Sequence, residues 1–188
     1  MTDWILSATE LPNLHPAFVH FPLALLPVAI GFDVVALVGW LRRRPLVEGA
    51  TAALYTLAAL GAWAAVWAGE EAEDSLAGLT PPVEALIEDH EEWAHRFLYT
   101  VAAVAIARLA VFWWSRRGTK AGQGAILAAR ALVLAGALAA LGLLLGTADR
   151  GGGLVFRAGV AVMAVPAEEG EAPAPAPARA EAAPRVPE

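Results

Sequence analysis

Four long apolar runs, separated by short polar connectors, constrain this chain more than any other feature. They cover residues 17–41, 46–69, 93–114 and 125–147. About 20 residues of helix cross a 30 Å hydrocarbon core, so each run is long enough to span a bilayer. Backbone polar groups find no water inside lipid, so a run that spans must be helical. The sequence therefore predicts an all-α, integral membrane four-helix bundle.

The composition supports a membrane protein and narrows its partners. Hydrophobic residues make up 58% of the 188 residues, against about 45–50% in soluble domains. The chain has no cysteine, which excludes disulfides, thiolate metal sites and a cysteine nucleophile. A net charge of -6 argues against nucleic acid, which binds basic faces. The expected partners are the lipid bilayer and a larger membrane complex or a homo-oligomer.

The charges between the runs predict an orientation. Basic residues occupy the connectors at 42–44 and 116–120, whereas the connector at 70–92 carries nine acidic residues and no Lys or Arg. Residues 1–41 also contain no Lys or Arg. Because basic connectors stay in the cytoplasm, both termini are expected to be extracytoplasmic. The expected location is the cytoplasmic membrane, with both basic connectors on its cytoplasmic side.

The C-terminal part changes character after the fourth run. Residues 154–165 are apolar, but they are too few to span a bilayer and include Arg157, so we expect an interfacial segment. Residues 166–188 are rich in Pro, Ala and Glu, a composition typical of a disordered tail. The expected division is a membrane domain at 1–165 and an extracytoplasmic tail.

All four histidines fall at the predicted outer end. His15 and His20 flank the start of the first run, and His90 and His95 flank the start of the third. Residues five apart on a helix point about 140° apart, so neither pair can easily bind one ion alone. We therefore expect ligands to come from two different helices.

The sequence favours a cofactor held between His20 and His95, flanked by His15 and His90. Two imidazoles can hold haem b iron axially, or they can contribute to a transition-metal site. Acidic residues near the same end could add oxygen ligands to a non-haem ion, namely Glu70, Glu71, Glu91, Glu92 and Asp149. Alternatively, the histidines only hydrogen-bond to loops, and no cofactor is bound.

Charged residues also occur inside the apolar runs. Asp33 and Arg108 each follow the second histidine of their run by thirteen residues, and Arg130 reaches a similar depth from the other side. A lone charge in lipid is costly, so these side chains should face the bundle and pair. We expect Asp33 to pair with Arg108 or Arg130, and Glu48 with the basic connectors. A proton or ion relay is the functional alternative.

The segment Leu14–Leu25 reads LHPAFVHFPLAL. It resembles the His-Pro-x-x-Val-His-Phe-Pro opening of a bacterial family of predicted four-helix membrane proteins of unknown function. The resemblance extends over about residues 14–163. Further similar elements lie at 69–73, 90–91, 152–156 and 159–162.

The resemblance implies the four-span fold and one constellation containing His15, His20 and His90. By analogy of architecture, it also implies a relation to small b-type cytochrome bundles. Family members often carry another histidine near the last element, where this chain has Arg157 and Ala158. The resemblance therefore implies fewer ligands here.

Three functions remain open from the sequence. The first is a membrane protein with a haem b or transition-metal site at its outer face. The second is a structural or accessory subunit without a cofactor, and the third is a small proton or ion transporter. The glycines at 151–153 are not followed by the Lys and Ser/Thr of a phosphate-binding loop. No motif assigns an enzymatic reaction.

Overall fold

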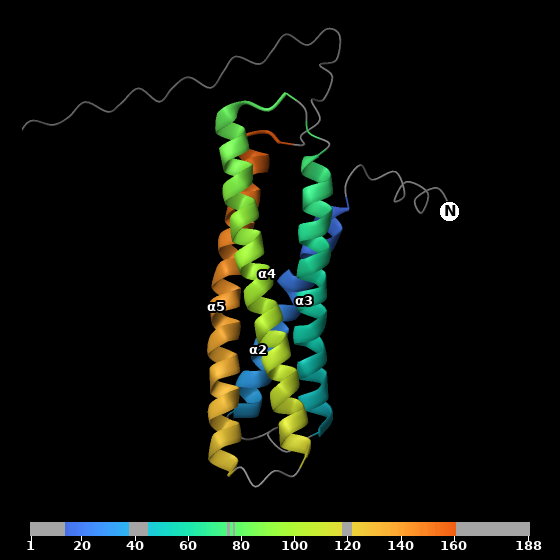
Figure 1. The fold of residues 1–188 in the computed structure, drawn as a ribbon, viewed down its shortest axis with the longest axis vertical. Coiled ribbons are helices and arrows are strands. Elements are labelled where there is room, and N and C mark those ends of the chain that lie inside the picture. The colour runs from blue at the N-terminus through green and yellow to red at the C-terminus, as the bar shows by residue number, and fades with distance from the viewer. Residues whose placement is uncertain (1–13, 38–44, 75, 77, 118–121, 161–188) are drawn as a thin grey trace, which may run out of the picture.

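Four helices make up the described part of the chain. A computed structural model describes residues 14–37, 45–74, 76, 78–117 and 122–160, and no strand occurs among them. All four helices are long and apolar enough to cross a membrane, so the predicted all-α four-helix fold is confirmed (Figure 1). The helices are α2 (His15–Leu37), α3 (Pro45–Glu73), α4 (Pro81–Arg116) and α5 (Gln123–Phe156).

Two helices extend well beyond their apolar runs. α4 has 36 residues and α5 has 34, which gives each a length of about 50 Å at 1.5 Å per residue. α4 starts with Pro81 and Pro82 in its first turn, where the missing N–H costs no helical hydrogen bond. α5 continues through the glycines at 151–153, so the segment expected at 154–165 begins as the last turn of this helix. Residues 161–188 lie outside the described part.

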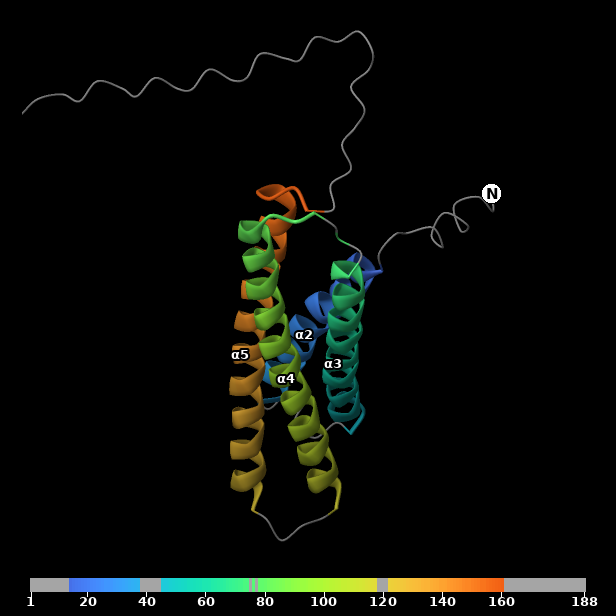
Figure 2. The ribbon, with the colours of Figure 1, turned by 45° about the horizontal axis from the view of Figure 1, so that its top comes forward.

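The helices form a square of two hairpins. α2 packs on α3 and α5, and α4 also packs on α3 and α5. α2 and α4 therefore stand on one diagonal and α3 and α5 on the other (Figures 1 and 2). The centre is filled by small and aliphatic side chains together with Tyr55, and Leu26, Ala58, Val101 and Ala137 are among the completely buried ones.

The outside of the bundle is apolar as well. Large side chains on several helices are exposed, among them Leu57, Trp63, Ile106 and Leu132. A water-soluble bundle would place polar residues at such positions. Lipid is the solvent that these faces require, so the bundle contacts the bilayer.

Candidate functional site

The end of the bundle where α2 and α4 begin and α3 and α5 end carries all four histidines, and we call it the histidine end. His15 and His90 face each other there across the diagonal. Their ring centroids lie 6.4 Å apart, and the two ring planes are inclined at 79° to each other. His15 Nδ1 lies 2.7 Å from the carbonyl oxygen of Ala65, and His90 Nδ1 lies 3.1 Å from that of Thr147.

These contacts define the chemistry of the two rings. A carbonyl oxygen only accepts, so each Nδ1 carries a proton, and Nε2 is the ring nitrogen with which the neutral form of each ring would bind a metal. His90 lies before the apolar run at 93–114. Burial lowers the pKa of His90 below its ordinary value, and the neighbouring His15 lowers it further. Both effects favour the neutral, metal-binding form of this ring.

Two glycines make room for the rings. A Cβ atom on Gly69 would lie 3.0 Å from Nδ1 of His15, and one on Gly151 would lie 3.0 Å from Cε1 of His90. Each glycine follows the residue that holds the same ring by four positions, Ala65 in α3 and Thr147 in α5. Each histidine therefore rests on one face of its neighbouring helix. The sequence could not predict that these two glycines lie beside the histidines, because that depends on which helices pair.

Both rings line one pocket of about 320 Å³ at the histidine end. Carboxylates of Glu70, Glu73 and Glu91 also line it. Most of its remaining wall is apolar and comes from all four helices, including Pro16, Val66, Ile87 and Leu154. The pocket therefore combines an apolar interior with two imidazoles and an acidic border.

A second cluster adjoins this pocket. Glu70, Glu91 and His95 each place one possible ligand atom within 4.8 Å of the others. His95 Nε2 lies 3.3 Å from Glu70 Oε1, while His95 Nδ1 lies 3.2 Å from the carbonyl oxygen of Glu91. Nε2 is therefore the ring nitrogen turned toward the carboxylate of Glu70. This cluster joins α3 to α4.

The remaining candidate ligands lie apart from these two groups. His20 is exposed, and its Nδ1 lies 2.5 Å from the carbonyl oxygen of Pro16 in its own helix. Glu92 is paired with Arg96, and Glu71 and Asp149 are exposed. The structure thus brings His15 to His90 and His95 to Glu70, whereas the sequence favoured His20 with His95.

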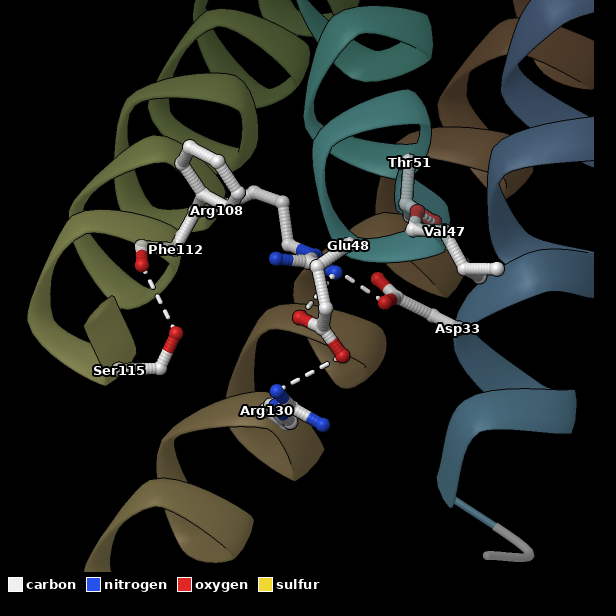
Figure 3. A network of polar contacts seen from close by, with 8 residues as sticks. All are labelled: Asp33, Val47, Glu48, Thr51, Arg108, Phe112, Ser115 and Arg130. Atoms are coloured by element: carbon white, nitrogen blue, oxygen red, sulfur yellow. Dashed lines mark hydrogen bonds and ion pairs between the residues drawn. The ribbon is translucent and has the colours of Figure 1, made fainter. Parts of the chain in front are cut away.

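A buried charge network lies toward the other end of the bundle (Figure 3). Arg108 Nε donates to Asp33 Oδ1 at 3.1 Å, and Arg108 Nη2 donates to Glu48 Oε2 at 3.2 Å. Arg130 Nη2 lies 2.8 Å from Glu48 Oε1. Each helix contributes one of these four charges, and all four side chains are buried. The two positive and two negative charges balance.

One expected pairing differs from the structure. We expected Glu48 to pair with the basic connectors, but its carboxylate contacts Arg108 and Arg130. Glu48 lies in the first turn of α3 and on the buried face of that helix, so its side chain points into the bundle. Residues 38–44, which hold one basic connector, lie outside the described part.

The comparisons with known proteins identify a family but no characterised relative. No curated protein and no solved structure matches the chain. The model of one family, described as "Predicted membrane protein (DUF2231)", matches residues 11–164. That range covers all four helices and both histidine pairs. The chain therefore belongs to the DUF2231 family of predicted membrane proteins.

Proposed function

We propose that this multi-pass membrane protein binds a haem b group at the histidine end, where His15 and His90 would hold it. The 6.4 Å separation of the two ring centroids carries the proposal. A metal held between two imidazoles at nitrogen–metal distances of about 2 Å sets the ring centres about 6 Å apart. The observed 6.4 Å is close to that value, although it also lies within the ordinary range of ring contacts, about 4.5–7 Å.

The surroundings of the two rings also suit such a group. Carbonyl oxygens on Nδ1 orient each imidazole and increase its basicity as a ligand, as is common for metal-bound histidine. Gly69 and Gly151 leave space beside the rings, and the apolar wall of the pocket would keep water from a macrocycle. Haem would supply one-electron redox chemistry. The protein's part is to bind, orient and shield it.

Absorption spectroscopy of the purified protein, loaded with haem, tests this proposal. We expect the Soret band of a six-coordinate, low-spin haem in the wild type, and its shift to a high-spin position or its loss in His15→Ala and in His90→Ala. His20→Ala is the matched control, because it removes an exposed histidine from the same end and should leave the band unchanged. A wild type that binds no haem, or a low-spin band that depends on His20 rather than His15, would contradict the proposal.

The Glu70–Glu91–His95 cluster favours a second candidate, a non-haem divalent ion. One imidazole and two carboxylates suit Fe²⁺, Mn²⁺ or Zn²⁺. Titration with Mn²⁺, followed by electron paramagnetic resonance, should detect one site that is lost in Glu70→Gln and in His95→Ala. Glu92→Gln is the control, because Glu92 pairs with Arg96 instead. Equal binding by all the variants would exclude this site.

We also propose that the histidine end faces the outside of a bacterial cytoplasmic membrane. The acidic connector supports this orientation, as do the basic residues Arg116 and Arg117 at the opposite end. The chain has no cysteine, so the variant Glu71→Cys would carry a single thiol, exposed at the histidine end. An impermeant thiol reagent should label it in intact cells. Labelling that occurs only after the cells are opened would indicate the opposite orientation, with the histidine end in the cytoplasm.

A further inference from the structure

The buried faces of α2 and α4 share one register. Every buried residue of α2 has a buried counterpart 75 positions later in α4. The pairs are Pro22 and Phe97, Leu26 and Val101, Ala29 and Val104, Ile30 and Ala105, Asp33 and Arg108, and Ala36 and Val111. The same offset relates His15 to His90 and His20 to His95.

A second constant offset relates α3 to α5. Every buried residue of α5 has a buried counterpart 82 positions earlier in α3. The pairs are Glu48 and Arg130, Thr51 and Val133, Tyr55 and Ala137, Ala58 and Ala140, and Ala62 and Leu144. The same offset relates Ala65 to Thr147 and Gly69 to Gly151, the residues on which the two histidines rest.

The contacts place these equivalent residues on one central line. In a square of helices, side chains that meet across a diagonal lie at the centre. His15 meets His90 and Asp33 contacts Arg108 across the α2–α4 diagonal, and Glu48 contacts Arg130 across the α3–α5 diagonal. Each of these contacts joins a residue to its own equivalent. That is the arrangement that a twofold axis produces.

We infer that the bundle consists of two copies of one helical hairpin, α2–α3 and α4–α5, related by a pseudo-twofold axis along the bundle, and that opposite buried charges make each copy the partner of the other. Both copies enter from the histidine end, so this is a parallel repeat with its axis along the membrane normal. The inference does not require any metal.

The charges specify which hairpins pair. The α2–α3 hairpin supplies two acids, Asp33 and Glu48, and the α4–α5 hairpin supplies arginines at the two equivalent positions. Two identical hairpins would place four like charges at the centre of a low-dielectric bundle, which is strongly unfavourable. The acidic hairpin is therefore complementary to the basic hairpin and not to a second copy of itself.

Charge exchange in the full chain tests this complementarity. The variant with Asp33→Arg, Glu48→Arg, Arg108→Asp and Arg130→Glu rebuilds the network with the two hairpins exchanged. We expect it to retain most of the wild-type yield of folded protein in detergent. The half exchange Asp33→Arg with Glu48→Arg should lose about tenfold or more, because it leaves four like charges in the membrane. Similar losses in the full and half exchanges would overturn the complementarity.

Distances between spin labels test the duplication without altering the network. The chain has no cysteine, so introduced cysteine pairs can be labelled selectively. Val28 and Ala103 are exposed equivalents, as are Leu57 and Ala139. The pair 28–57 should give the same distance as 103–139, and the pair 28–139 the same as 57–103. Distances that differ beyond the width of their distributions would contradict the twofold relation.

Discussion

The two hairpins share a register but differ in what they offer chemically. His20 and His95 are equivalent by the offset of 75. His95 lies against Glu70 and follows Glu91, whereas the residues equivalent to those acids are Gly152 and Pro16. Among the described residues, His95 belongs to a carboxylate cluster and its equivalent His20 does not. The contacts that cross the axis join two histidines or two opposite charges, whereas Glu70 and Glu91 have no acidic equivalents.

This comparison shows how the pair chosen from the sequence for its equal depth differs from the pair that meets in the structure. His20 and His95 begin their runs at corresponding positions, which made them appear to be a facing pair. His15 and His90 meet at the axis. A residue five positions further along is turned by about 140°, so it cannot also face the axis. His20 consequently points away from the bundle centre, and His95 reaches α3 instead.

The largest expected effect distinguishes the two arginines of the basic hairpin. Arg108 contacts both acids and Arg130 contacts Glu48. Arg108→Leu leaves two buried carboxylates without this partner and should lower the unfolding free energy by about 3–5 kcal/mol. Arg130→Leu should cost less. Thermal unfolding in detergent measures both, with Arg116→Leu as an exposed control. Equal losses for Arg108 and Arg130 would contradict the central role of Arg108.

Much of the fold could be predicted from the sequence because lipid imposes simple rules. Four apolar runs of membrane-spanning length predict four helices, and opposite charges at similar depths predict a buried pair. The contacts of Glu48 could not be predicted, because they depend on which face of α3 turns inward. The repeat was also hidden: its register appears in burial, while few residue types apart from the histidines are shared.

The effect of intermediate size is the loss of stability when a glycine that makes a close contact inside each hairpin is replaced by alanine. A Cβ on Gly61 would lie 2.6 Å from Cβ of Phe21, and one on Gly146 would lie 2.5 Å from Cζ3 of Trp93. The first neighbour is fixed near its backbone, whereas the second is the far end of a side chain. Gly61→Ala should therefore destabilise more than Gly146→Ala, within about 1–3 kcal/mol.

Thermal unfolding of the two glycine variants provides the measurement. Gly142→Ala is the control, because a Cβ there meets nothing within 4 Å. It should stabilise α5 by about 0.5–1 kcal/mol, since alanine is the better helix former. The reverse order, with Gly146→Ala the more damaging, would show that the α4–α5 hairpin is the more rigid of the two.

The smallest expected effect is on the pH dependence of the unfolding free energy, to which His90 should contribute and His20 should not. The pKa of His90 is lowered by burial in the folded chain, so the unfolded chain binds the proton more readily. Stability contributed by the neutral ring is present above the unfolded pKa of about 6.5 and is lost as the pH falls below it. His90→Asn should flatten this slope between neutral and mildly acidic pH, and His20→Asn should not. An unchanged slope in His90→Asn would contradict the burial argument.

Electron paramagnetic resonance of the oxidised, haem-loaded protein tests the central claim most directly. Two axial imidazoles produce a low-spin ferric signal. The account predicts that signal in the wild type and in His20→Ala, and its conversion to a high-spin signal, or its loss, in His15→Ala and His90→Ala. A wild type that stays high-spin, or a low-spin signal that survives removal of His15 or His90, would contradict it.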